Sequence, residues 1–507
     1  MKKLLCLIMT LLVLAAFTGA ALAAPAVDRD KTLIVANYAD TNTLDPMHSS
    51  SAVGANIFLQ IYDYLFFQEP DGAISPRLVE KWEQPDPTTY IFHLKQGVKF
   101  HNGYPFTADD AIFTINRGRT MISATASHVL LNMIEDVKKI DDYTISIHLN
   151  TPFTPFLYVF SEQWGGVVSK KTIEEMGEEA HARNPVGSGP WKFVEWIKGD
   201  RVVMDRNEDY HGQKPEFERL IVRAVPEDSV RTIELESGAI DMAYQVHVND
   251  FKRIEENAKL TLMRRNALRV QFISFNCKKA PLDDPRVRHA LVKAIDIAGL
   301  QRAVYRGIGY APAGPLPRDM RYSDPSLEVP KQDIEGAKKL LAEAGVKDLK
   351  INICTNEQKD RTDAATILQA MFDEIGVKAD ITVMEYGAYT DKVYGGDYDI
   401  SLFGWGNNLP DAEFALTRLY HSRSIGSSNF SFLNDPRLDE LLDAGVRAPE
   451  GDERAAVYKE VQKVFIEDMP ALYWAVQEVA LAYGQRISEF PMHIRGIYEL
   501  NKVKKAN

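Results

Sequence analysis

Cysteine is scarce in this chain of 507 residues, and its scarcity excludes some kinds of site. Only Cys6, Cys277 and Cys354 are present, too few for a structural zinc site of the usual Cys-rich kind. Cys277 and Cys354 both lie in strand-like runs, where an exported protein could pair them or keep them as two buried thiols. The sequence leaves both possibilities open.

The usual catalytic motifs are also missing. The chain has no G-x-x-x-x-G-K-[ST] phosphate loop and no H-E-x-x-H metal helix. Gly187-Ser188-Gly189 lacks the spacing of a G-x-S-x-G nucleophile elbow, and the 11 histidines are dispersed. We therefore predict that the protein is not an enzyme and has no catalytic residues, metal or cofactor. A secreted hydrolase, with a triad built from distant residues, is the enzyme alternative.

A clustered basic stripe is absent as well. The formal net charge is −12, and an acidic chain without such a stripe binds nucleic acid poorly. We therefore expect no nucleic-acid partner.

One long apolar run is present, and it lies at the start of the chain. Residues 4–17 follow Lys2 and Lys3 and lead to Ala21-Leu22-Ala23, the layout of a cleavable secretory signal peptide over residues 1–23. The run is shorter than the ~20 residues that a spanning helix needs. Cys6 lies within the run rather than at the cleavage point, which argues against a lipid anchor. We expect a soluble mature protein exported to the periplasm.

The pattern of the mature chain favours two lobes, since its length exceeds one ordinary core. The first half reads mostly as strands, for example at 32–35, 90–94, 145–149, 201–204 and 220–222. The second half alternates helices and strands: helices at 285–295, 334–344, 366–375 and 436–442, strands at 350–353 and 381–383. This alternation predicts an α/β lobe with a largely parallel sheet. A cleft between two lobes is where small ligands bind.

Residues 89–115 read TYIFHLKQGVKFHNGYPFTADDAIFTI. They resemble the characteristic segment of the solute-binding proteins of dipeptide, oligopeptide and nickel ABC importers. His101-Asn102-Gly103 suits a turn between strands and Thr107 suits a helix N-cap, so the segment's own role is structural. Other stretches resemble the family in the same order: 42–46, 61–65, 185–191, 281–291, 337–345 and 398–405.

The resemblance implies an α/β, bilobal periplasmic-binding-protein fold of the dipeptide/oligopeptide-binding type. Lobe I is expected at 24–271, with a small inserted subdomain at about 71–189, and lobe II at 272–479. Residues 480–507 then return to lobe I. The lobes would close on the ligand about a hinge, and the closed form would signal the transporter.

The function implied is that of a substrate-binding protein, a monomer that captures a short peptide or peptide-like solute. It would deliver this solute to the permease subunits of an ABC importer in the inner membrane. Glutathione, a nickel chelate, a sugar or an opine are alternative ligands, and a sensory subunit is an alternative role.

Four positions of the expected cleft come from the resemblance. The segment 49–53, here represented by Ser50 and Ala52, would bring backbone to the ligand. Phe113 falls where an aromatic residue often faces ligand, although core packing explains it equally well. The loop with Gly404 and Trp405 is the strongest candidate. Tyr473 or Trp474 would close the far wall, and the sequence does not decide which.

The charged anchors are the remaining predictions. Many relatives place an Asp three residues after this Trp, but here Asn408 is neutral and cannot supply a charge-assisted bond to an ammonium. Asp411, followed by Ala412-Glu413-Phe414, resembles the glutathione-binding type and is our candidate amine anchor. The alternative is an exposed loop carboxylate. Arg361, in the expected loop before the helix at 366, is the candidate carboxylate anchor, with surface solvation as its alternative.

Overall fold

A computed structural model describes residues 27–49, 51–120, 131–407 and 409–506, apart from the side chain of Gln163. The predicted signal peptide, Ser50 and Asn408 lie outside the described residues. Within them, no helix is long and apolar enough to cross a bilayer. Cys277 and Cys354 are free thiols.

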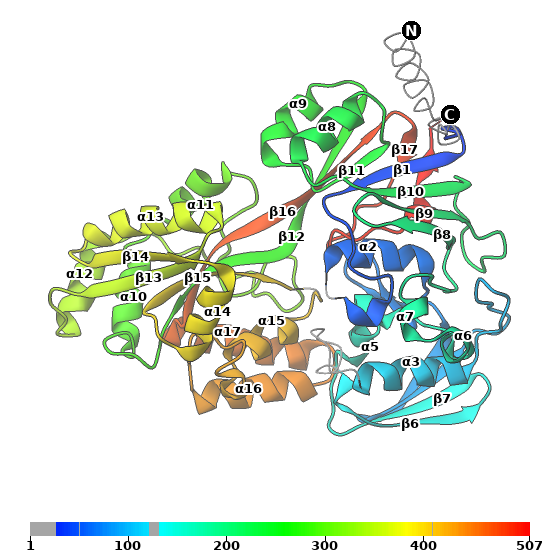
Figure 1. The fold of residues 1–507 in the computed structure, drawn as a ribbon. Coiled ribbons are helices and arrows are strands. Elements are labelled where there is room, and N and C mark those ends of the chain that lie inside the picture. Colours follow the sequence, from blue (N-terminus) through cyan, green and yellow to red (C-terminus); the bar gives the residue numbers. More distant parts are fainter. Residues whose placement is uncertain (1–26, 50, 121–130, 408, 507) are drawn as a thin grey trace, which may run out of the picture.

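One ten-stranded sheet runs through both halves of the molecule (Figure 1). Its strands lie in the order β14 (Lys378–Met384), β13 (Lys350–Asn356), β15 (Ile400–Gly406), β12 (Leu260–Phe275), β16 (Ala471–Gly484), β11 (Met242–Tyr244), β1 (Thr32–Asn37), β10 (Arg219–Ala224), β9 (Arg201–Arg206) and β8 (Trp191–Ile197). The predicted parallel pairing holds for β13 with β14 and with β15. The long strands β12 and β16 join this group in antiparallel pairing.

A second, four-stranded antiparallel sheet lies in the first half of the chain. It runs in the order β4 (Val79–Asp86), β5 (Thr89–Leu94), β7 (Thr144–Leu149) and β6 (Ile134–Asp141). The remaining short strands are β2 (Phe66–Gln68), β3 (Ile74–Pro76), β17 (Ile487–Glu489) and β18 (Lys504–Lys505).

Helices cover both faces of the main sheet (Figure 1). In the first half they are α2 (Ala52–Ile61), α3 (Ala108–Thr120), α5 (Phe156–Val159), α6 (Lys170–Met176), α7 (Glu178–His181), α8 (Asp228–Glu236) and α9 (Phe251–Glu255). In the second half they are α10 (Pro285–Lys293), α11 (Ile297–Tyr305), α12 (Ile334–Glu343), α13 (Lys359–Asp373), α14 (Tyr386–Gly395), α15 (Ala412–Tyr420), α16 (Pro436–Arg447) and α17 (Asp452–Asp468). Short 3₁₀ helices lie at Pro46–His48, Gln163–Gly165, Val248–Asp250, Ser422–Ser424 and Leu500–Lys502.

Capping residues begin the helices of the second half where the sequence predicts. Asp284, Asp333 and Asp435 each accept a hydrogen bond from a backbone N–H of the first turn, which would otherwise lack a partner. The helix predicted at 366–375 is the exception, because α13 already begins at Lys359. Its first turn is polar and shows no apolar period, so the sequence pattern could not reveal it.

The motifs that resemble the solute-binding family meet in space. The backbone N–H of His101 donates to the Gly187 carbonyl at 2.8 Å, and its Nε2–H donates to the Gly189 carbonyl at 3.0 Å. Ser188 Oγ donates to Asp63 Oδ2 at 3.0 Å. The turn 101–103 therefore holds the 185–191 segment against the end of α2, the structural role predicted for it.

Two bodies lie on either side of β12 and β16, which cross between them (Figure 1). We call these bodies lobe I and lobe II. The predicted boundaries at 271/272 and 479/480 fall inside β12 and β16, so the lobes share continuous strands and the exact division stays a prediction.

Gly187 offers a test of this packing. A Cβ at this position would lie 2.0 Å from the Ile61 carbonyl oxygen, and backbone cannot move as a side-chain end can. We expect Gly187→Ala to lower the free energy of unfolding in urea by about 1–3 kcal/mol. Gly395→Ala is the matched control, since nothing lies within 4 Å of its added Cβ. Equal effects of the two substitutions would contradict the proposed packing.

Candidate ligand-binding site

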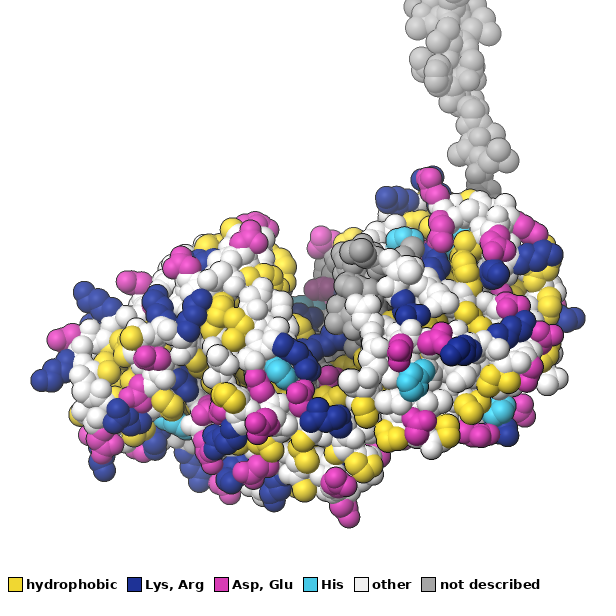
Figure 2. Space-filling model, turned by 90° about the horizontal axis from the view of Figure 1, so that it is seen from below, with side chains coloured by type: hydrophobic (Ala, Val, Ile, Leu, Met, Phe, Trp, Pro, Cys, Tyr) yellow, Lys and Arg dark blue, Asp and Glu magenta, His cyan; other side chains and the backbone are white. Residues whose placement is uncertain are grey.

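The surface is hollowed between the two lobes, and Lys and Arg side chains gather there (Figure 2). The strands β12 and β15 lead into this region from lobe II, with Arg269 directly opposite Gly406. Ligands of open α/β sheets bind where parallel strands end at their carboxyl edge, and β1, β13 and β15 are such strands. This is the region to which the sequence assigned most of the candidate residues.

The Gly404-Trp405 segment is the end of strand β15 rather than a loop. Successive side chains of a strand point to opposite faces of the sheet. Trp405 lies on the face of Phe403 and makes an edge contact with Phe430 at 6.2 Å between ring centroids. Gly404 and Gly406 lie on the other face. Trp405 therefore projects from one face of the sheet, and the two glycines lie on the opposite face.

The glycine face carries an unusual set of polar groups. Gln271, on β12, lies opposite Gly404, and a Cβ on Gly404 would come within 2.6 Å of the Gln271 amide and 2.8 Å of Arg361 Nη2. Gln271 is 1% exposed, and neither polar atom of its amide has a hydrogen-bond partner among the described residues. A buried amide without partners is costly, which makes this position a candidate for contact with a ligand.

Arg361 lies over Gly404 on this face, and we call the face with Gly404, Gly406 and Gln271 the Arg361 strip. The structure corrects both predictions about the surroundings of Arg361. It belongs to the first turn of α13 rather than to a loop, and it is 4% exposed rather than solvated. Its Nη1 donates to Asn356 Oδ1 at 2.9 Å, while its Nε has no described partner. No carboxylate of the described residues forms an ion pair with it. Burial lowers the pKa of Arg361, and Arg269 acts in the same direction.

Trp474 and Tyr473, between which the sequence does not choose, point to opposite faces of the sheet. Trp474 stacks on Tyr305 at 5.5 Å, and Tyr305 donates a hydrogen bond to Asp360, the neighbour of Arg361. Tyr473 packs on Phe272 on the Trp405 face. Trp474 is therefore the one on the Arg361 side.

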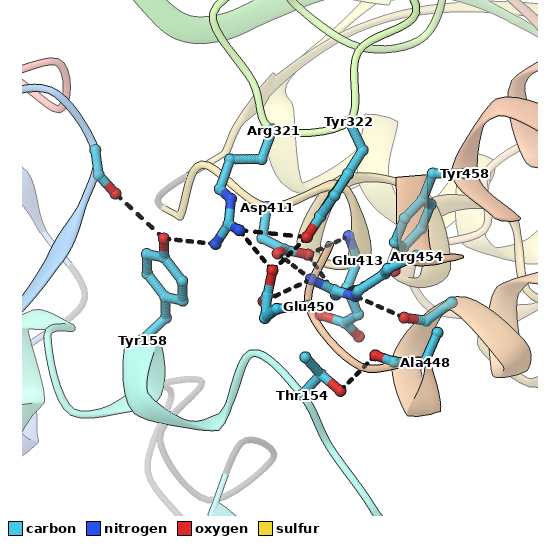
Figure 3. Close-up of polar contacts among 12 residues, drawn as sticks. Thr154, Tyr158, Arg321, Tyr322, Asp411, Glu413, Ala448, Glu450, Arg454 and Tyr458 are labelled. Carbon is cyan, nitrogen blue, oxygen red and sulfur yellow. Dashed lines mark hydrogen bonds and ion pairs between the residues drawn. The ribbon is translucent and has the colours of Figure 1, made fainter. Parts of the chain in front are cut away.

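Asp411 takes a different role from the predicted one (Figure 3). It is fully buried, caps α15 through the backbone N–H of Glu413, and accepts two hydrogen bonds from Arg454, at 2.6 and 2.8 Å. Arg454 is fully buried as well. The Asp411 carboxylate is thus neither exposed nor free for an ammonium, and its predicted role as amine anchor finds no support in this arrangement.

A contact between the lobes lies beside this ion pair (Figure 3). Arg321 of lobe II donates to the Tyr158 hydroxyl of lobe I at 3.1 Å and pairs with Glu450 at 2.5 Å. Thr154 donates to the Ala448 carbonyl at 2.7 Å. Phe414 packs edge-on against Phe153, within the apolar core around the four-stranded sheet. Lobe II is therefore held to the inserted region of lobe I by polar and apolar contacts.

The other predicted residues lie apart from the Arg361 strip. Ala52 is exposed at the start of α2, whose N-cap is Ser51. Phe113 is half-buried against the core of lobe I, so its role in ligand contact stays a prediction. Ser50 and Asn408 lie outside the described residues.

Sequence reasoning missed Arg269 and Gln271. Both interrupt the apolar run 268–275 of β12, and polar residues on one face of a buried strand were the available signal. Among the described residues, no group of three or more His, Cys, Asp or Glu could hold a metal ion.

Comparison with known proteins identifies the family to which the chain belongs. Residues 73–427, more than half of the chain, match the profile of the bacterial extracellular solute-binding proteins, family 5. Heme-binding protein A of Haemophilus influenzae is 30% identical over 443 residues, covering 81% of this chain and 80% of that protein. The dipeptide-binding protein of Escherichia coli is 28% identical over 475 residues, covering 87% and 88%.

Solved structures agree with this assignment. The periplasmic binding protein DppA of Helicobacter pylori, in complex with the peptide STSA, superposes with a TM-score of 0.79. It is 25% identical, and the alignment covers 94% of this chain and 98% of that one. The predicted mixed α/β fold of this binding-protein type is confirmed.

The Asp411–Arg454 pair yields a stability prediction. Removing one partner of a buried ion pair leaves an uncompensated charge, which costs about 3–5 kcal/mol. We expect Arg454→Met to lower the free energy of unfolding in urea by this amount, and Asp411→Asn to restore part of the loss in the double variant. Arg437→Met, at a half-exposed arginine, is the control. A loss below about 1 kcal/mol for Arg454→Met would instead mean that Asp411 is available to other groups.

Glu413 yields a pH prediction. It is buried, its Oε2 has no described partner, and burial raises its pKa to about 7. The folded state then holds a proton that the unfolded state releases above about pH 4.3, so stability falls as pH rises from about 4.3 to 7. At pH 8, Glu413→Gln should be more stable than the natural protein by about 3 kcal/mol, and at pH 4 the two should agree. Urea unfolding across this range measures it, and a pH-independent difference would contradict it.

Proposed function

Because the chain belongs to family 5 of the bacterial extracellular solute-binding proteins, we propose that it captures a short peptide or peptide-like solute between its lobes. The family also makes it a non-catalytic receptor of an ABC importer, as the missing catalytic motifs led us to predict. We further propose export to the periplasm and delivery of the solute to the permease of the importer. Lobe I, at 24–271 and 480–507, and lobe II, at 272–479, would close about β12 and β16.

The observation that carries the peptide proposal is the unpaired guanidinium of Arg361. A buried charge without a counter-ion is expensive, and a guanidinium presents a planar fork that matches a carboxylate. The free C-terminal carboxylate of a peptide would supply the missing charge. It would also reach the unpartnered amide of Gln271, which lies over the same glycine.

The surroundings of Arg361 suit a ligand with an organic body. Trp474 and Tyr305 stack together on this side of the sheet, and aromatic rings offer flat apolar contact. The relatives named above are called heme-binding and dipeptide-binding proteins, or are bound to a peptide. Membership of the family therefore does not identify the solute of this chain. A carboxylate at Arg361 is the feature that we expect the solutes of this chain to share.

Glutathione is the second candidate ligand. The run Asp411-Ala412-Glu413-Phe414 resembles the glutathione-binding type, and glutathione is a peptide-like solute with carboxylates at both ends. Recognition of its amine would have to come from a residue other than Asp411, because Arg454 occupies that carboxylate.

Closure about the hinge would couple binding to transport. A solute that contacts both lobes stabilises the closed form by its differential affinity. Arg361 and Gln271 would hold the solute from lobe II and the shared strand, while Tyr158 and Arg321 bring the lobes together beside it.

The role of Arg361 can be tested with ligand and protein changed together. We expect a dipeptide free acid to bind the mature protein, stripped of carried ligand by unfolding and refolding. Its C-terminal amide should bind at least about 30-fold more weakly, because a desolvated charge pair is worth about 2–5 kcal/mol. Arg361→Gln should weaken the acid to the level of the amide, measured by titration calorimetry.

Controls separate this loss from misfolding. Arg361→Gln removes an uncompensated buried charge, so its thermal stability without ligand should match or exceed that of the natural protein. Arg302→Gln changes an exposed arginine of lobe II and should leave binding intact. If Arg361→Gln keeps the full preference for acid over amide, Arg361 is not the anchor.

A further inference from the structure

Arg269 is a second arginine of this region without a partner. It lies on β12 and is exposed, and its side chain makes no hydrogen bond, ion pair or ring contact with any residue that the structure describes. Elsewhere on the same strand, Arg264 and Arg265 both have partners, Glu478 and the Pro70 carbonyl. Of the arginines on β12, Arg269 is thus the one that lies on the strip, and it has no partner among the described residues.

The backbone directs Arg269 onto the Arg361 strip. In the regular pairing with β15, Arg269 lies opposite Gly406 and Gln271 opposite Gly404, so both side chains leave the same face. On its other edge, β12 bulges between Asn266 and Val270 in its pairing with β16. Bulges redirect side chains beside functional sites.

Space for a ligand lies next to Arg269. A Cβ added to Gly406 would meet nothing within 4 Å, and Gly406 is exposed. Arg361 lies over Gly404, two residues earlier on β15. The two arginines therefore flank a glycine-lined strip, with about 7 Å of strand between their positions.

Two arginines lie on the strip, and the nearby Asp360 carboxylate is engaged by other groups. The positive charge of Arg269 lowers the pKa values of Arg361 and Tyr305 in lobe II and of Tyr38, which follows β1 in lobe I, although burial is the larger influence on all three. Asp360, the acid next to Arg361 in sequence, accepts hydrogen bonds from Tyr305 and from the Arg361 backbone. Neither arginine forms an ion pair with a carboxylate of the described residues.

We propose that Arg269 is a second anion-binding residue, and that the preferred solute carries two separate acidic groups, one for Arg361 and one for Arg269. This inference rests on the proposed function, because Arg361 must bind the first group. The ligand class is then a dicarboxylate peptide, such as a peptide ending in Glu or glutathione itself. Arg269 would select among the solutes that Arg361 admits.

Matched ligand pairs test the proposal on the full mature chain. The pairs are Ala-Glu with Ala-Gln, and glutathione with its analogue in which 4-aminobutyrate replaces the γ-glutamyl residue. The members of each pair differ by one carboxylate, and all keep the C-terminal carboxylate that Arg361 would bind. The natural protein should bind the diacid about tenfold more tightly than its partner. Arg269→Gln should bring this ratio close to one while leaving Ala-Gln binding unchanged, and Arg269→Lys should keep part of the preference.

The possible outcomes separate the role of Arg269 from the role of Arg361 and from the proposed function. Arg183→Gln removes an exposed arginine of lobe I and should leave every ratio unchanged. If the natural protein binds these ligands but Arg269→Gln keeps the full diacid preference, or no such preference exists, the role of Arg269 is overturned and that of Arg361 stands. If no member of either pair binds the natural protein, the proposed function falls, and this inference falls with it.

Discussion

The pairing of β12 with β16 is the constraint on which the rest of the molecule depends. The two strands cross from one lobe to the other and pair along most of their length, so each lobe completes its sheet with strands that the other also uses. The lobes cannot separate without breaking this ladder. Its register shifts between Asn266 and Val270, a stretch that contains Arg269, and again between Gln271 and Phe272. If the lobes rotate at these irregular places, the hinge and the candidate site share residues of one strand.

Two buried arginines of lobe II illustrate opposite ways of handling charge. Arg454 has its counter-ion inside the chain, in a two-point contact with Asp411, and this pair fixes the start of α15 against α17. Arg361 has an amide for its partner and no carboxylate in the described chain. The first arrangement stabilises the lobe, since both charges are satisfied. The second is costly in isolation and becomes favourable when an anion arrives from outside.

Much of the architecture could be predicted from sequence, because it follows from local rules. Asp-Pro pairs and isolated Asp residues begin helices, apolar alternation marks strands, and the turn at 101–103 binds a second motif through the backbone and side chain of His101. The site was less accessible, because it depends on which face a residue takes. Trp405 and Gly404 are neighbours in sequence but serve opposite faces. The sequence suggested that Asp411 is a free carboxylate of a loop, because its partner, Arg454, lies 43 residues away along the chain. Arg361 read as a solvated loop residue because the first turn of α13 is polar.

The contact of Tyr158 with Arg321, which also pairs with Glu450, is made entirely by the chain itself, so its free energy is the same for every solute. Whatever it contributes to closure raises the fraction of molecules closed before a solute arrives. Solute enters only the open fraction, and the apparent rate of capture falls with that fraction. The same contribution must be overcome before a captured solute escapes, which lengthens its residence time. Residues that never touch the solute would therefore determine how long it stays bound, while the proposed arginine strip would determine which solute binds.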